Sequence, residues 1–284
     1  LNFYLSWSYI VKYLQYLFTF IFIISFNIGV AFAEDRVGVV LLHGIGTQPQ
    51  WSKNSTLASN LRSEGYDVVT PIFPWAGKNG KTEYNGSLQD AYSLISEKVS
   101  DLKSQGNKYI FLAGHSVGAV ASFGYASEHS GINGVIGVTP GFPGWDAPTP
   151  MNNSLDFKPK ILENMSNRAH KRIDMGKGDE DFEFVTKNHG KKFKIWTTPN
   201  NYLSFHHLEG VSRMDLVMPK LNVPVLWIST SEDVFTENGL SEEAYSLAPN
   251  NEMNKYVEIS TQHNSAPANS EEHIISWINK VKGG

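Results

Sequence analysis

Short apolar runs recur along the chain and are separated by longer amphipathic stretches. Runs of about four to eight apolar residues are typical of strands that are buried on both faces. They predict strands at 37–42, 66–71, 109–113, 132–139, 223–229 and 255–259. Between the runs, apolar residues at helical spacing predict helices at 51–65, 87–106, 241–247 and 271–282. Because strands alternate with helices, the sequence predicts an α/β fold with a doubly wound, mostly parallel sheet.

Residues 142–220 interrupt this alternation. Roughly 80 residues of irregular pattern inside an α/β alternation favour an insertion over the carboxyl edge of the sheet rather than a separate domain. We therefore expect one domain at 34–284, with an inserted lid at 142–220. Within the insertion, the pattern predicts a helix at 158–175 and a hairpin made of 182–185 and 192–196. Elsewhere, the polar stretch 79–85 predicts a loop.

The first 33 residues form a separate apolar segment. Leu, Phe and Ile dominate residues 14–30, and Lys12 is the one charged residue before Glu34. The segment ends in Ala31-Phe32-Ala33, the small-x-small pattern that signal peptidases read. We expect a cleaved signal peptide at 1–33, export to the periplasm or medium, and no stable membrane insertion after cleavage. The alternative is an uncleaved membrane anchor, because the apolar stretch is just long enough to span a bilayer.

Composition narrows the possible chemistry. The net charge is −4 and no block of Lys or Arg stands out, so we do not expect nucleic-acid binding. There are no cysteines, which excludes disulfides, thiolate metal sites and cysteine nucleophiles. We expect no metal, because adjacent residues such as His206 and His207 point to opposite faces of a strand. We also expect no cofactor: Gly44-Ile45-Gly46 follows a strand, but Pro49 stands where a dinucleotide loop has its third glycine.

The strongest chemical signal lies between residues 108 and 126. The predicted strand 109–113 leads into Gly114-His115-Ser116-Val117-Gly118, a G-x-S-x-G motif. Small residues follow at helical spacing, at Ala119, Ala121, Gly124 and Ala126. A strand, a tight turn and a small-faced helix are the context in which this motif forms a nucleophile elbow. Such a turn holds its serine at positive φ, a strained conformation that proteins keep at functional sites. The alternative is an ordinary glycine-rich turn.

A serine hydroxyl needs a base, a group that orients the base, and donors for an oxyanion. In open α/β sheets, functional groups gather at the carboxyl ends of the strands. Asp233 follows the predicted strand 223–229, and His263 follows the predicted strand 255–259. Ser116, Asp233 and His263 are therefore the candidate nucleophile, acid and base.

Some of these assignments have alternatives. Glu232 and Asp146 are the other candidates for the acid, and Asp146 follows the predicted strand 132–139. His43 and His115 flank the predicted site, and we expect them to form hydrogen bonds with the loops around it.

These motifs resemble the α/β-hydrolase superfamily, over most of residues 37–145 and 222–281. The resemblance rests on Leu41-Leu42-His43-Gly44, Gly114-His115-Ser116-Val117-Gly118, Pro224-Val225-Leu226-Trp227-Ile228 ahead of Asp233, and His263 before the last helix. Within the superfamily, the chain is similar to small exported bacterial serine hydrolases of the dienelactone-hydrolase type, with serine in place of cysteine.

The resemblance implies Ser116 as nucleophile, His263 as base and acid, and Asp233 as its orienting carboxylate. It also implies that the backbone N–H groups of Ile45 and Val117 form an oxyanion hole. Thr230 departs from the family pattern, because a glycine usually stands there ahead of the acid, and we expect the turn near Asp233 to differ.

Aromatic residues concentrate on the loops that follow the predicted strands. They are Trp51, Phe73, Trp75, Phe142, Trp145, Tyr202 and Phe205. We expect Trp75, Phe142, Trp145 and Tyr202 to contact substrate in an apolar pocket. The alternative is that these rings belong to the core, where most large aromatic side chains pack.

Together, these features predict a serine hydrolase that cleaves carboxylic esters through an acyl-enzyme. The expected substrate is a small-molecule or lipid-like ester. Thioesterases, lipases and peptidases use the same machinery, and a fold alone does not choose among them. A catalytically weak binding protein on this scaffold is a further alternative.

Overall fold

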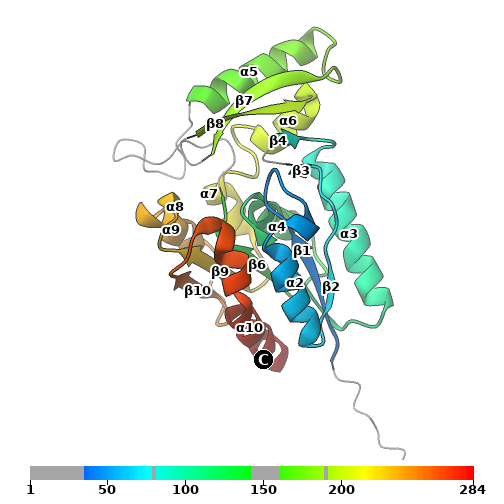
Figure 1. Cartoon of the computed structure of the whole chain (residues 1–284), viewed down its shortest axis with the longest axis vertical. Helices are drawn as coiled ribbons and strands as arrows, with labels where there is room; N and C mark the ends of the chain where they lie inside the picture. Colours follow the sequence, from blue (N-terminus) through cyan, green and yellow to red (C-terminus); the bar gives the residue numbers. More distant parts are fainter. Residues whose placement is uncertain (1–34, 79–80, 142–159, 189–190) are drawn as a thin grey trace, which may run out of the picture. The chain divides into compact units, whose positions relative to one another are not determined.

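The central sheet contains six parallel strands (Figure 1). Across the sheet they are β10 (Lys255–Ile259), β9 (Val225–Thr230), β6 (Gly134–Val138), β5 (Tyr109–His115), β1 (Val37–Leu42) and β2 (Asp67–Val69). The computed structural model describes residues 35–78, 81–141, 160–188 and 191–284, and its elements belong to one compact unit, Arg36–Gly284. All neighbouring strands of this sheet run parallel. This confirms the predicted doubly wound α/β sheet.

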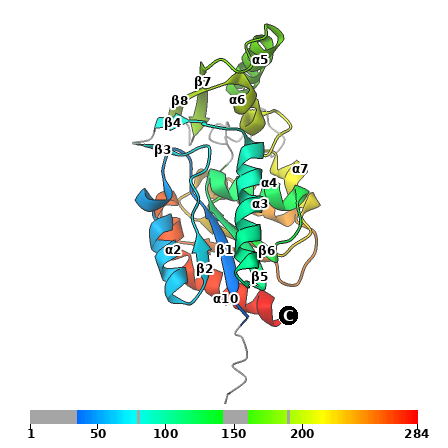
Figure 2. The same ribbon diagram turned by 90° about the vertical axis from the view of Figure 1, so that its right-hand side faces the viewer.

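Helices cover both faces of the sheet, and the strands are buried accordingly (Figure 2). Among the helices that pack in the two core clusters are α2 (Asn54–Ser63), α3 (Leu88–Ser104), α4 (Val117–Glu128) and α10 (Glu271–Gly283). Every residue of β1 is buried. Val40 and Leu42 pack in one cluster with α3 and α4, whereas Val39 and Leu41 pack in the other with α2 and α10. The continuous apolar runs therefore reflect strands with two buried faces.

A second, four-stranded sheet lies beyond the carboxyl ends of the central strands (Figures 1 and 2). Its strands, in order, are β3 (Gly77–Lys78), β4 (Lys81–Glu83), β8 (Lys191–Thr197) and β7 (Phe182–Asn188). We call it the cap sheet. The antiparallel pairing of β7 and β8 confirms the predicted hairpin, and α5 (Lys160–Asp174) confirms the predicted helix. A further helix, α6 (Pro199–His206), follows β8.

The cap sheet also contains two strands that we did not predict: β3, and β4, which lies where we expected a loop at 79–85. The three residues of β4 are polar and carry no apolar alternation. Their strand conformation comes from the parallel ladder with β8, in which Thr82 pairs with Ile195. The cap sheet therefore combines two segments that are far apart in the sequence.

Aromatic packing and hydrogen bonds join the cap elements to other parts of the compact unit. The ring of Phe205 in α6 contacts Trp75 and Tyr84, at centroid distances of 5.7 and 4.6 Å. The hydroxyl of Thr197 donates to the carbonyl of Tyr84 at 2.8 Å, and the N–H of Leu88 donates to the Ser204 hydroxyl at 2.9 Å. From α6 the chain returns through α7 (Met214–Val217) to strand β9.

Two predicted features lie outside the described residues. They are the signal peptide or anchor at 1–33 and the first part of the insertion, which includes Phe142, Trp145 and Asp146. No helix in the described ranges is long and apolar enough to cross a membrane.

Candidate active site

The strand order reverses between β1 and β5. From β1 the chain adds β2 on one side and then places β5, β6, β9 and β10 on the other. In open α/β sheets, ligands bind outside the carboxyl ends of the strands at such a switch point. The residues at this point are His43-Gly44 after β1 and Ser116 after β5.

Ser116 sits on a strained turn between β5 and α4. Its φ is 56° and its ψ is −122°, so it is one of the two non-glycine residues with positive φ in the described chain. Its N–H donates to the carbonyl of Val138 at 3.0 Å, which fixes the turn against β6. The positive φ agrees with the expectation from the sequence, and such strain is typical of functional positions.

Two glycines of the G-x-S-x-G motif are required by close backbone contacts. A Cβ at Gly114 would lie 2.2 Å from the carbonyl oxygen of Gly118. A Cβ at Gly118 would lie 2.7 Å from the carbonyl oxygens of both Leu42 and His43. No side chain fits at either position. The two glycines therefore allow α4 to pack closely against β5 and β1 behind Ser116.

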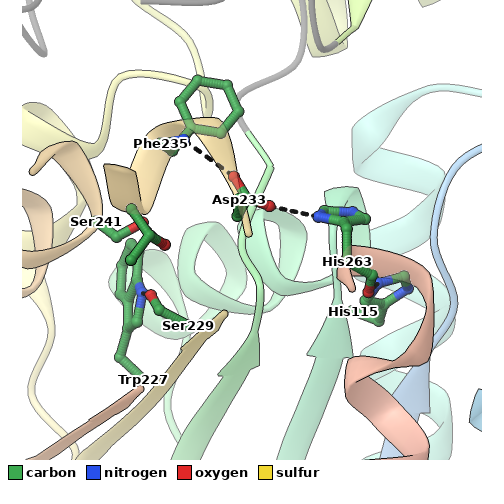
Figure 3. Close-up of polar contacts among 8 residues, drawn as sticks. His115, Trp227, Ser229, Asp233, Phe235, Ser241 and His263 are labelled. Atoms are coloured by element: carbon green, nitrogen blue, oxygen red, sulfur yellow. Dashed lines mark hydrogen bonds and ion pairs between the residues drawn. The ribbon is translucent and has the colours of Figure 1, made fainter. Parts of the chain in front are cut away.

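Asp233 and His263 form a short hydrogen bond (Figure 3). The Nδ1 atom of His263 lies 2.5 Å from Oδ2 of Asp233. The other carboxylate oxygen, Oδ1, accepts a hydrogen bond from the N–H of Phe235 at 3.0 Å. This second bond arises because Asp233 caps the helix α8 (Val234–Glu237). Both oxygens therefore have fixed partners, and only 3% of Asp233 is exposed.

The structure distinguishes Asp233 from Glu232, one of the two other candidate acids. Glu232 is exposed to solvent, whereas its neighbour Asp233 is buried against the histidine. Asp146 lies outside the described residues. Thr230, the departure from the family pattern, has an ordinary negative φ, and its carbonyl accepts from the N–H of Asp233 at 3.1 Å. The turn therefore closes without the glycine that is usual there.

His115 supports the loop that carries His263. Its Nε2 atom lies 3.0 Å from the backbone carbonyl oxygen of His263, and the two ring centroids are 5.0 Å apart. Because a carbonyl only accepts, Nε2 of His115 carries the proton. Burial lowers the pKa of His115 to about 3, so the ring stays neutral. Figure 3 shows it beside the backbone of His263 and away from the carboxylate.

His43 joins the loops after β1 and β2. Its Nε2 accepts from the N–H of Phe73 at 3.1 Å, so its proton resides on Nδ1, 2.8 Å from the carbonyl of Gly44. The indole of Trp75 donates to the carbonyl of His43 at 2.8 Å. Burial lowers the pKa of His43 to about 4. His43 and His115 thus form the loop hydrogen bonds expected from the sequence.

The two predicted oxyanion donors lie next to Ser116. Val117 begins α4, and Ile45 follows Gly44, where an added Cβ would lie 3.5 Å from the Cβ of Ser116. Within the described ranges, the N–H groups of Ile45 and Val117 donate no hydrogen bond to the protein. Their use as oxyanion donors remains a prediction.

Sequence reasoning missed two residues beside Ser116. Thr139, at the end of β6, has a φ of 43°, and its N–H donates to the carbonyl of Ile228 at 2.7 Å. A Cβ at Gly141 would lie 3.1 Å from the hydroxyl oxygen of Ser116. A side chain at position 141 would therefore crowd the hydroxyl of Ser116. The nearness of Gly141 to Ser116 depends on the tertiary structure, and no local sequence pattern signalled it.

Burial favours core packing for Trp75 and Tyr202, which we expected to contact substrate. Both side chains are fully buried. Tyr202 lies between the rings of Phe184 and His206, with centroid distances of 4.0 and 4.6 Å. Trp75 stacks on Phe73 at 4.9 Å. The contact of Trp75 and Tyr202 with substrate remains a prediction. Phe142 and Trp145, the other two predicted contacts, are not among the described residues.

We expect Tyr202→Ala to lower the free energy of unfolding by about 3–5 kcal/mol, as for other buried aromatic side chains. Tyr202→Phe is the matched control. The Tyr202 hydroxyl is buried without a hydrogen-bond partner in the described chain, so its removal should cost little or stabilise the fold. Urea unfolding of both variants measures this. A substrate-contact role predicts the opposite: unchanged stability after Tyr202→Ala and an altered preference among esters.

Three buried histidines should make the fold sensitive to acid. Burial lowers the pKa values of His43, His115 and His206 to about 4, 3 and 3, below the ~6.5 of a free imidazole. Below about pH 6.5 the unfolded chain therefore binds more protons than the folded chain. The stability that the neutral histidines contribute is fully present above that pH, and it is lost as the pH drops toward 4. The slope is about 1.4 kcal/mol per pH unit for each histidine.

Urea unfolding between pH 7 and pH 5 measures this slope. His206→Gln should reduce it by about a third, because one of three groups is removed. His170→Gln, which changes an exposed histidine, should leave it unchanged. A stability that stays constant over this range would contradict the expectation.

The described residues contain no group of three His, Cys, Asp or Glu side chains that could hold a metal ion. The adjacent histidines considered for metal binding differ in environment: His206 is buried, with Nε2 3.0 Å from the Tyr84 hydroxyl, and His207 is exposed.

Comparisons with known proteins assign the chain to a family of hydrolases. The family model Hydrolase_4, described as serine aminopeptidase, S33, matches residues 33–261. The match includes Ser116 and Asp233 and ends just before His263. No curated protein matches the chain significantly.

Several solved structures are similar in fold. One comes from work on LipS and LipT, two metagenome-derived lipolytic enzymes, with 18% identity over 88% of this chain and 95% of that one, and a TM-score of 0.57. A monoacylglycerol lipase from Paleococcus ferrophilus has 19% identity over 86% and 94%, with a TM-score of 0.56. Est1E from Butyrivibrio proteoclasticus, bound to ferulic acid, has 15% identity over 87% and 91%, with a TM-score of 0.53.

Proposed function

The chain belongs to the serine aminopeptidase S33 family of α/β hydrolases, and from this premise we propose that it cleaves carboxylic esters through an acyl-enzyme. The observation that carries the proposal is the short hydrogen bond between Asp233 and His263 at the same sheet edge as Ser116 on its strained turn. These are the three groups that an activated serine requires.

The proposed mechanism follows from the hydrogen bonds. Asp233 accepts the Nδ1 proton of His263, which leaves Nε2 unprotonated as the base. His263 takes the hydroxyl proton of Ser116 as the oxygen attacks the ester carbonyl. The N–H groups of Val117 and Ile45 stabilise the oxyanion, and His263 then returns the proton to the departing alcohol. Water, activated by the same histidine, releases the acid from Ser116.

Lipid-like esters are the proposed substrate class. Two of the similar structures belong to proteins called lipolytic enzymes or a lipase, and a third binds ferulic acid. Gly141 has no side chain that would crowd the Ser116 hydroxyl, which favours the approach of an acyl group. A peptidase is the second candidate, because the family description names an aminopeptidase.

A substrate panel separates these candidates. Purified protein would be assayed against chromogenic acyl esters of graded chain length, a matched thioester and aminoacyl anilides. The proposal expects turnover of oxygen esters to exceed that of the anilides at every chain length. Preferential cleavage of anilides would identify a peptidase. Absence of turnover on all three classes would favour a binding protein on this scaffold.

We also propose that the cap covers the active site as a lid and that the protein is exported. The position of the cap sheet beyond the carboxyl ends of the central strands supports the first idea. The apolar segment 1–33 with its Ala31-Phe32-Ala33 end supports the second. N-terminal sequencing of protein from the periplasm or medium should begin at Glu34. An intact N-terminus in the membrane fraction would favour an anchor.

A further inference from the structure

The loop that follows β1 carries Ile45, one of the two predicted oxyanion donors. Its N–H belongs to the peptide bond between Gly44 and Ile45, so the plane of this peptide sets the direction of the donor. Peptide bonds are planar, and none in the described ranges is cis. In a trans peptide the carbonyl and the N–H point in opposite directions. A contact that holds the Gly44 carbonyl therefore also aims the N–H of Ile45.

His43 holds this carbonyl. Its Nδ1 atom donates to the carbonyl oxygen of Gly44 at 2.8 Å, and the proton is on Nδ1 because Nε2 accepts from the N–H of Phe73. The imidazole therefore lies on one side of the peptide, and the N–H of Ile45 points to the other. Gly44 itself lies against the candidate nucleophile, because an added Cβ would be 3.5 Å from the Cβ of Ser116.

Trp75 fixes the loop on both sides of this peptide. Its indole N–H donates to the carbonyl of His43 at 2.8 Å. Its backbone carbonyl accepts from the N–H of Gly46 at 3.1 Å. These two bonds hold the residues directly before and after Gly44-Ile45. One residue therefore holds both ends of the short segment that carries the predicted donor.

The side chain of Trp75 is held in place by its packing. It is fully buried, it stacks on Phe73 at a centroid distance of 4.9 Å, and the ring of Phe205 meets it edge-on at 5.7 Å. His43 is fully buried as well, and within the described ranges the indole is the one donor bonded to its carbonyl. A buried carbonyl that loses its donor is costly, so the loop would shift to recover a partner.

We propose that Trp75 is a positioning residue for the oxyanion donor, and that it aims the N–H of Ile45 by holding His43 and Gly46 on either side. This inference rests on the proposed acyl transfer, because the oxyanion forms in that reaction. Trp75 acts through the loop and does not contact the substrate in this role. Oxyanion donors are effective because they are preorganised toward the charge that develops in the transition state. Loss of the indole N–H should therefore weaken transition-state binding and leave substrate binding unchanged.

A pair of matched variants tests the role. Trp75→Phe removes the indole N–H and keeps an aromatic ring beside Phe73. We expect kcat on the best ester to fall by about tenfold, less than the roughly 10²–10³-fold lost when a donor is deleted, with KM within about twofold of the parent. Trp277→Phe is the control: Trp277 is equally buried in the other core cluster, and its indole donates to the carbonyl of Met253 at 2.6 Å. The control should lower stability and leave kcat unchanged.

Two further measurements separate positioning from packing and from substrate contact. An alkylboronic acid, which forms a tetrahedral adduct with an active serine, should bind Trp75→Phe about tenfold more weakly than it binds the parent or Trp277→Phe. The loss in kcat should be the same for esters of every chain length. Replacement of Trp75 by 3-benzothienylalanine keeps the bicyclic ring and lacks the N–H. This variant should show the same losses, and it provides the test if Trp75→Phe does not fold.

Three results would overturn the proposal. The first is a parental kcat and boronic-acid affinity in the 3-benzothienylalanine variant. The second is an equal loss of kcat in Trp75→Phe and Trp277→Phe, which would mean that general destabilisation is the cause. The third is a changed preference for ester chain length, which would indicate that Trp75 contacts the substrate. A parent protein that cleaves no ester and binds no boronic acid would refute the proposed function itself, and that outcome is recognised before any variant is made.

Discussion

Replacing Ser116 by Ala is expected to lower kcat by about three orders of magnitude or more and to leave the fold intact. The change removes one hydroxyl and keeps the Cβ on the strained turn, so the packing of α4 against β5 is preserved. The oxyanion donors and the substrate contacts remain, and they account for the activity that is left. Measurement of kcat and KM on the best ester, with a thermal unfolding curve for the variant, tests both parts.

A fluorophosphonate probe gives an independent readout. It should label Ser116 in the parent protein, and the label should be absent from Ser116→Ala. Ser127→Ala is the matched control, because Ser127 lies on the same helix with its hydroxyl bonded to the carbonyl of Gly124. This variant should keep both the label and the activity. A label found by mass spectrometry on a different serine would refute the assignment of the nucleophile.

Asp233→Asn is expected to lower kcat by about four orders of magnitude. The amide oxygen of the new side chain would accept from the N–H of Phe235, as Oδ1 of Asp233 does. Its NH₂ group would then face Nδ1 of His263, where Oδ2 now accepts. Two donors cannot share that contact, so the imidazole would adopt the tautomer with its proton on Nε2. In that form it cannot accept the proton of Ser116.

The neighbouring carboxylate provides the control for this change. Glu232→Gln alters an exposed side chain one residue away and should leave kcat within about twofold of the parent. Asp146→Asn tests the alternative carboxylate suggested by the sequence. If Asp146→Asn abolished activity and Asp233→Asn did not, the acid would belong after β6 instead of β9.

The central sheet could be predicted because its strands have a hydrophobic pattern that is visible in the sequence. Burial on two faces requires continuous apolar runs, and β1 and β5 have them. The turn at Ser116 could also be predicted from the sequence, because only glycine fits at Gly114 and Gly118. The pairing of Asp233 with His263 followed from the rule that strand ends meet at one edge.

Other features could not be read from the sequence, because they depend on tertiary partners. Strand β4 is polar, and its conformation comes from pairing with β8. Tyr202 looks the same in sequence whether it lines a pocket or stacks between Phe184 and His206. The nearness of Gly141 to Ser116 depends on how β6 ends beside β5, and no local pattern encodes it.

The cap sheet is built from two segments that are far apart in the sequence. This limits which chimaeras can be made between this protein and its relatives. An exchange of 142–220 alone would separate β8 from β4 and leave one side of β8 without its hydrogen-bonded neighbour. An unpaired strand edge invites pairing with another chain and aggregation. A chimaera that is meant to inherit the specificity of a donor hydrolase must therefore carry residues 77–83 together with the insertion. Libraries with crossovers placed only at the two ends of the insertion should yield mostly insoluble protein.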